Sequence, residues 1–129
     1  MFEHRFQVKP LSANVMTGRN KTYKTAAYSA YQNEIRDELM GIDWPFAKSP
    51  VAFYIEAGLS NRGQDLDNIV KPVLDTYQSI YEEFNDNKVY EIELQKVITP
   101  KNSEYLLVRI TEAEEKVAEA APTEEVYTI

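Results

Sequence analysis

Four aspartates and one lysine in the middle of the chain have the residue types and spacing for metal and phosphate chemistry. Asp65 and Asp67 are two positions apart, so in an extended backbone their carboxylates point to the same face. Such a pair can bind one hard cation such as Mg²⁺, which takes oxygen ligands. Lys71 and Asp75 follow at intervals of four, so on a helix they continue the stripe that begins at Asp67. Asp86 comes after this helix, and its carboxylate completes a predicted divalent-cation site if the chain returns to the same end.

Each of these residues also has a purely structural explanation. Asp67 could cap the helix, and Lys71 with Asp75 could form a surface ion pair worth a few tenths of a kcal/mol. Asp86, which stands between two asparagines, could serve the turn. The residues alone leave both explanations open, and the fold decides between them through the position of Asp86.

Other catalytic arrangements have little support in the sequence. The chain has one histidine, His4, and no cysteine, which excludes thiolate metal sites and disfavours a Ser-His-Asp or Cys-His arrangement. Its four glycines are scattered, so the chain has no glycine-rich phosphate loop. The lack of cysteine, of a long apolar run and of a charged-then-apolar leader predicts a cytoplasmic protein with no membrane partner.

Hydrophobic periodicity predicts the elements that must position these residues. Residues 25–40 and 69–81 carry helical apolar stripes. Pro72 fits only the first turn of a helix, so the second helix is expected to begin near Asn68 or Ile69. Alternating apolar residues predict strands over residues 4–8, 51–57, 88–99 and 105–111. This order, β-α-β-α-β-β, predicts an α+β fold with helices packed on one face of a small mixed sheet, whose last two strands pair as a hairpin.

The charge is distributed unevenly along the chain. The net charge is −7, of which −5 belongs to the six acids and one base of residues 112–129. This segment has the composition of an acidic, disordered tail, which leaves residues 1–111 as one nearly neutral folded domain. A local basic face on that domain is open to two explanations, a solvated loop or a phosphate-contacting surface. The candidate DNA-binding residues are Arg19, Lys21, Lys24 and Arg62.

Several of these residues recur together in one known pattern. They are Asp65-Leu66-Asp67-Asn68, Lys71, Asp75 and the turn Asn85-Asp86, together with Pro10-Leu11-Ser12-Ala13-Asn14 and the basic loop after it. In this order and spacing they resemble the RusA family of Holliday-junction resolvases, and the resemblance covers residues 4–111. Asn85 stands where the family commonly has an aspartate, so Asp86 is the residue of that turn that inherits a metal-binding role.

The resemblance implies a homodimeric, Mg²⁺-dependent endodeoxyribonuclease, with Mn²⁺ as an alternative metal, that cuts four-way DNA junctions in recombination and repair. It implies that Asp65, Asp67 and Asp86 bind the metal, which activates water and neutralises charge on the phosphate. Lys71 would lie beside the scissile phosphate as the fourth catalytic residue, and Asp75 would orient Lys71. The alternative is a non-catalytic DNA-binding or protein-interaction module on the same scaffold.

Overall fold

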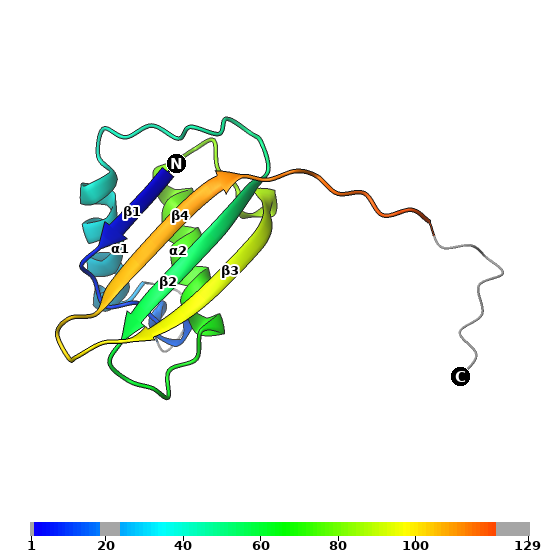
Figure 1. The fold of residues 1–129 in the computed structure, drawn as a ribbon. Coiled ribbons are helices and arrows are strands. Elements are labelled where there is room, and N and C mark those ends of the chain that lie inside the picture. The colour runs from blue at the N-terminus through cyan, green and yellow to red at the C-terminus, as the bar shows by residue number, and fades with distance from the viewer. Residues whose placement is uncertain (1, 19–23, 121–129) are drawn as a thin grey trace, which may run out of the picture.

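A four-stranded mixed sheet carries both α-helices on one of its faces (Figure 1). The computed structural model describes residues 2–18 and 24–120. The strands are β1 (Phe2–Phe6), β2 (Val51–Leu59), β3 (Val89–Ile98) and β4 (Tyr105–Glu112). The helices are α1 (Ala26–Leu39) and α2 (Asp67–Ile80), and two short 3-10 helices, η1 (Ala13–Val15) and η2 (Asp86–Lys88), lie in loops. The predicted α+β class and element order are therefore confirmed.

The core forms between the helix-facing side of the sheet and one stripe of each helix. The sheet contributes alternating side chains, of which Val51, Phe53 and Ile55 on β2 are almost fully buried. The helices contribute Tyr28, Tyr31, Ile35 and Leu39 from α1 and Ile69, Val73 and Tyr77 from α2. Each fully buried apolar side chain of this size stabilises the fold by about 1.5–3 kcal/mol. The helical spacing seen in the sequence thus marks the buried stripes correctly.

The predicted hairpin between residues 88–99 and 105–111 is wrong. The strand order is β1-β4-β2-β3, so β2 lies between the two strands. β3 is parallel to β2, with Val89 beside Val51, whereas β4 is antiparallel to both β2 and β1. The physical reason is the burial of β2. Since most of its residues are apolar and buried, this strand gains most from a central position with a neighbour on each side.

The start of α2 also differs from the prediction. The helix begins at Asp67, before Asn68 and Ile69, and Pro72 therefore lies inside it instead of in its first turn. Pro72 cannot donate a backbone hydrogen bond to the carbonyl of Asn68. Burial of the Pro72 ring offsets part of this loss. The first turn is closed separately, by a bond of 2.9 Å from the N–H of Ile69 to the carbonyl of Leu66.

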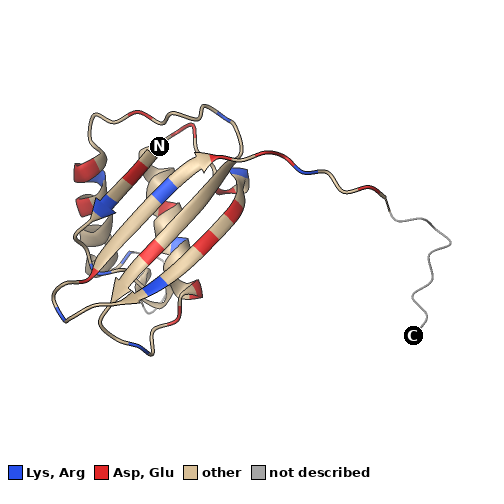
Figure 2. Cartoon of the chain, in the orientation of Figure 1, with Lys and Arg blue, Asp and Glu red and all other residues tan. Residues whose placement is uncertain are grey.

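Charged and aromatic side chains gather on the face of the sheet opposite the helices, and Figure 2 shows acidic and basic residues distributed along the strands. Glu56 accepts hydrogen bonds from the hydroxyls of Tyr54, at 2.7 Å, and of Tyr105. The guanidinium of Arg109 lies 4.8 Å from the centre of the Tyr54 ring, and that of Arg5 lies 3.8 Å from the centre of the Tyr105 ring. This face therefore satisfies its own polar groups while remaining open to solvent.

No helix in residues 2–18 and 24–120 is long and apolar enough to cross a membrane. Beyond β4, residues 113–120 form neither helix nor strand and run away from the sheet (Figure 1). An ion pair of 3.6 Å between Lys116 and Glu91 is their contact with β3. Because both side chains are well exposed, this pair contributes little to stability.

Gly58 of β2 lies directly beneath the ring of Tyr105, its partner on β4. We expect Gly58→Ala to lower the free energy of unfolding by about 1–3 kcal/mol, because the added Cβ would overlap that ring. Urea denaturation measures the effect, and Gly63→Ala is the matched control because a Cβ there would approach its nearest neighbour only to 3.4 Å. In a Tyr105→Ala background the same substitution should cost less; an equal cost in both backgrounds would contradict the contact.

Glu56 should make stability depend on acid pH. The hydrogen bonds from Tyr105 and Tyr54 lower the pKa of Glu56 below its ordinary value of 4.5. The bond between Tyr54 and Glu56 also raises the pKa of Tyr54 to about 12. Since the folded state lowers the carboxyl pKa, the stabilisation is complete above pH 4.5 and is lost as the pH falls through the lower, folded-state value. Glu56→Gln should flatten the decrease in unfolding free energy on acidification, and the exposed Glu82→Gln should leave that decrease unchanged.

Candidate functional site

Asp65 and Asp67 lie at the N-terminus of α2, at the end of the sheet where β2 finishes. Asp65 is in the loop, Asp67 is the first residue of the helix, and both side chains are exposed. The backbone between them is not extended, because Leu66 has helical φ and ψ values of −66° and −36°. The prediction that alternation along an extended run points both carboxylates to one face is therefore wrong. The explanation of Asp67 as a helix cap is wrong, because Leu66 holds the cap position and no side chain bonds there. The N–H of Ile69 already donates to the carbonyl of Leu66, so the N–H groups of Asp67 and Asn68 are the ones that could receive an anion such as a phosphate. Two carboxylates, water and a phosphate oxygen are together a ligand set suited to Mg²⁺.

Lys71 lies one turn along α2 from Asp67 and forms an ion pair with Asp75. The distance from Nζ of Lys71 to Oδ2 of Asp75 is 3.2 Å. The Lys71 side chain remains 66% exposed, whereas that of Asp75 is 29% exposed. As a stabilising contact such an exposed pair is weak. The pair holds the ammonium group along the helix, toward Asp75, which lies one turn further from the helix N-terminus.

Behind Asp75, a polar network that the sequence analysis missed connects α1 to α2. Gln32 of α1 is 3% exposed and its amide nitrogen donates to the hydroxyls of Tyr28, at 3.0 Å, and Thr76, at 3.2 Å. Its amide oxygen accepts a 2.6 Å hydrogen bond from Lys24. Burial and the nearby charge of Asp75 raise the pKa of Tyr28, so its phenol stays neutral. The signal in the sequence was a glutamine on the apolar stripe of α1, four residues after Tyr28.

Asp86 lies at the other end of α2. Its backbone N–H donates to the side chain of Gln78, in the last turn of the helix, at 2.9 Å. It begins η2, which leads into β3 where Val89 lies beside the first residue of β2 (Figure 1). The fourteen residues of α2 span about 20 Å. One chain therefore does not bring Asp86 to Asp65 and Asp67. Among residues 2–18 and 24–120, no three acidic or histidine side chains come together to hold a metal ion.

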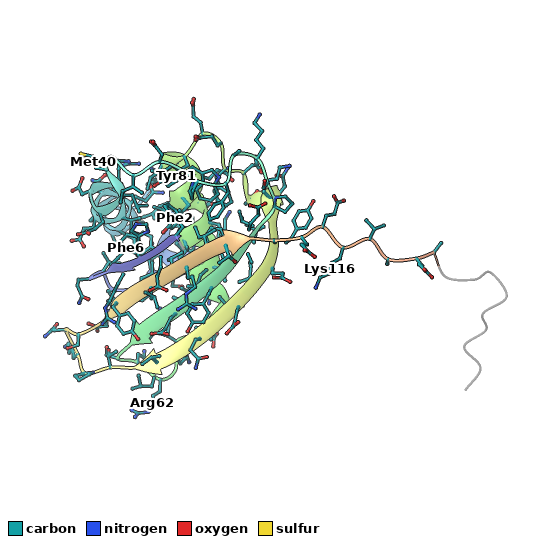
Figure 3. The ribbon with its side chains drawn as sticks, turned by 45° about the horizontal axis from the view of Figure 1, so that its top comes forward. Phe2, Phe6, Met40, Arg62, Tyr81 and Lys116 are labelled. Atoms are coloured by element: carbon teal, nitrogen blue, oxygen red, sulfur yellow. The ribbon has the colours of Figure 1, made fainter. Side chains whose placement is uncertain are left out.

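Of the four candidate DNA-binding residues, the structure describes Arg62 and Lys24. Arg62 lies in the loop between β2 and α2, at the same end as Asp65, and its side chain projects away from the body of the protein (Figure 3). Lys96 supports this loop by donating to the carbonyl of Arg62 at 3.0 Å. Lys24 is held by Gln32, as described above. Arg19 and Lys21 lie outside the described residues.

A groove of about 540 Å³, with a mostly apolar lining, adjoins the N-terminal end of α2. Its walls come from the segment around Pro10 and Leu11, from Tyr31 of α1 and from Gln64, the residue before Asp65. The segment that resembles the RusA opening thus lies beside the aspartate pair. Sequence reasoning placed these two segments in separate loops and did not predict their contact.

No model of a known protein family matches the chain, and no curated protein matches it. The resemblance to RusA resolvases therefore rests on the motif residues themselves.

Gln32 should be the most sensitive polar residue behind the candidate site. We expect Gln32→Ala to lower the free energy of unfolding by about 1–3 kcal/mol, because it leaves the hydroxyls of Tyr28 and Thr76 without their shared partner. Chemical denaturation followed by circular dichroism measures this change. Asn33→Ala, at an exposed position on the same helix, is the control and should cost far less. Equal effects of the two substitutions would show that the network does not stabilise the fold.

Proposed function

We propose that the protein is a Mg²⁺-dependent endodeoxyribonuclease that hydrolyses phosphodiester bonds in four-way DNA junctions, with Mn²⁺ as an alternative metal. One observation carries the proposal: Asp65 and Asp67 are both exposed at the N-terminal end of α2, where no side chain caps the helix, and Lys71 follows one turn later. This is the chemistry that a phosphate and a hard cation need on one small surface. The order and spacing of the motif residues support the choice of junction DNA as the substrate.

Each side chain has a distinct role in this mechanism. The carboxylates of Asp65 and Asp67 would hold the cation. When bound, it would supply an activated water and offset charge on the phosphate. Lys71 stabilises the negative charge that develops on the scissile phosphate or on the leaving oxygen. Asp75 keeps the Lys71 ammonium in place through the 3.2 Å ion pair.

The remaining contacts to DNA involve the backbone phosphates. Arg62, in the loop before Asp65, and Lys24, just before α1, supply positive charge for these contacts. Arg19 and Lys21 are further candidates from the sequence. Such contacts fix the position of the duplex and carry no sequence information. Symmetrical cleavage of a junction needs two active sites at a fixed separation, which a homodimer provides.

Asp67→Asn should abolish Mg²⁺-dependent cleavage of a synthetic four-way junction while the protein remains folded. The substitution keeps the shape of the side chain and removes the charge that binds the cation. Gel assays with labelled junctions measure cleavage, and circular dichroism checks the fold. Asp37→Asn, at an exposed aspartate on α1, is the matched control and should cleave like the wild type. Wild-type activity in Asp67→Asn would refute the proposal.

Lys71→Ala should lower the rate of cleavage by about 100- to 1,000-fold with little change in metal binding.

The separation of Asp86 from the aspartate pair favours a second candidate, a non-catalytic module that binds DNA or another protein on the same scaffold. Calorimetric titration of the wild-type protein with Mg²⁺ distinguishes the two. The nuclease should bind the ion at millimolar concentration, and this binding should disappear in Asp67→Asn. The non-catalytic module should show no binding in either protein.

A further inference from the structure

A second groove, of about 470 Å³, lies where both α-helices end. Its floor is apolar and contains Leu39, the last residue of α1, together with Trp44 and Tyr81, which are 7% and 6% exposed. The hydroxyl of Tyr81 donates to the carbonyl of Ile42 at 2.8 Å, which ties the connection after α1 to the end of α2. The floor of the groove is therefore preformed.

The rim of this groove carries two exposed apolar side chains. Met40, at the C-cap of α1, is 73% exposed, and Ile42 is 37% exposed. Both residues line the groove, and Figure 3 shows Met40 at the same end of the molecule as Tyr81. Methionine is flexible and adapts its shape to what it contacts. Exposed apolar side chains beside a preformed apolar floor are typical of a surface that binds a partner.

Acidic side chains surround the same groove. Asp43 belongs to the connection after α1, Glu82 and Glu83 follow α2, and all three are exposed. Burial, followed by the charges of Asp43 and Glu83, raises the pKa of Tyr81, so carboxylates from both segments act on one point of the floor. The C-termini of the two helices add partial negative charge.

The groove has little positive charge of its own. Arg36 is the only base among the described residues that line it. The guanidinium of Arg36 donates to Asn33, one turn back along α1, at 3.0 Å. No ion pair in the described part of the chain involves the three carboxylates of the groove. The groove therefore keeps a negative charge that cations of a partner can neutralise.

We propose that this acidic groove binds a basic amphipathic segment of a partner protein. An apolar side chain of the segment packs on Met40, Ile42 and the floor, and the lysines or arginines beside it pair with the carboxylates of the rim. DNA and anionic membranes carry the same sign of charge as the groove, so neither is its occupant. The groove lies at the opposite end of α2 from Asp65 and Asp67, and its binding function holds whether or not the protein cuts DNA.

Fluorescence of Trp44, the only tryptophan in the chain, reports binding in the groove. The probe is a synthetic peptide of about 14 residues, made of leucine and lysine with the leucines on one face of a helix. It should shift the Trp44 emission to shorter wavelength in a saturable manner, because it removes water from the groove. A peptide with glutamate in place of lysine should leave the emission unchanged, as should one with serine in place of leucine. No saturable shift with the first peptide would overturn the proposal.

Paired charge reversals test whether the groove itself attracts the peptide. Glu82→Lys with Glu83→Lys should weaken binding by about tenfold or more at low salt, because attraction becomes repulsion at two positions. Glu91→Lys with Glu93→Lys changes the net charge equally on the other face of the sheet and should weaken binding far less. All four glutamates are exposed, so circular dichroism should show both variants folded. Equal weakening would mean that the peptide responds only to net charge, which would overturn the groove as its site.

Met40→Ser tests the apolar part of the contact. It should weaken peptide binding about three- to tenfold, because it removes apolar surface that the leucines cover. Val117→Ser, at an apolar residue that is 84% exposed beyond β4, is the matched control and should have no effect. Equal binding by Met40→Ser and the wild type would contradict the role of the rim.

Light scattering distinguishes a partner protein from a second copy of the chain. The wild type and the variant with Glu82→Lys and Glu83→Lys should have the same mass in solution. A lower mass for the variant would show that a second copy covers the groove, and this result would overturn the proposal.

Discussion

The parallel pairing of β2 and β3 determines most of what this molecule can do. Two neighbouring parallel strands start at the same end of a sheet, so the chain must cross the whole sheet between them, and here α2 makes that crossing. The residues before and after α2 are therefore held at opposite ends of the sheet. Asp65 and Asp67 fall at one end and Asp86 at the other, although all three lie within a short stretch of sequence. Closeness along the chain does not become closeness in space when a crossover helix intervenes.

The sequence was sufficient to predict what depends on local periodicity. The stripes of α1 and α2, the alternation in β2 and the order of the elements follow from the spacing of apolar residues, and the structure confirms them. Strand pairing depends on contacts between distant segments, which spacing does not report. The short connection between β3 and β4 indicated a hairpin, but the burial of β2 placed that strand between them. The same long-range information was missing for Asp86, because its position depends on whether β3 is parallel or antiparallel to its neighbour.

The candidate site shows the same division between local and distant information. The stripe of Asp67, Lys71 and Asp75 was readable from intervals of four, and the ion pair between the last two exists as expected. The support behind it was not readable, because Gln32 and Thr76 are far apart in sequence and meet only when the two helices pack. A buried glutamine is retained in an apolar interface at a cost in desolvation unless its donors and acceptors are satisfied. Both the amide nitrogen and the amide oxygen of Gln32 have hydrogen-bond partners. The network therefore fixes α1 against the part of α2 that follows Lys71.

A free edge at β3 is costly for an isolated chain. Charged side chains and covering elements usually protect such edges, and both protections are incomplete here. Charged residues stand on the open face at Glu91 and Glu93, but on the helix-facing side Ile92 and Ile98 remain exposed. The parallel crossover therefore has two consequences within one chain: it leaves β3 as an edge strand, and it holds Asp86 at the far end of α2 from Asp65 and Asp67.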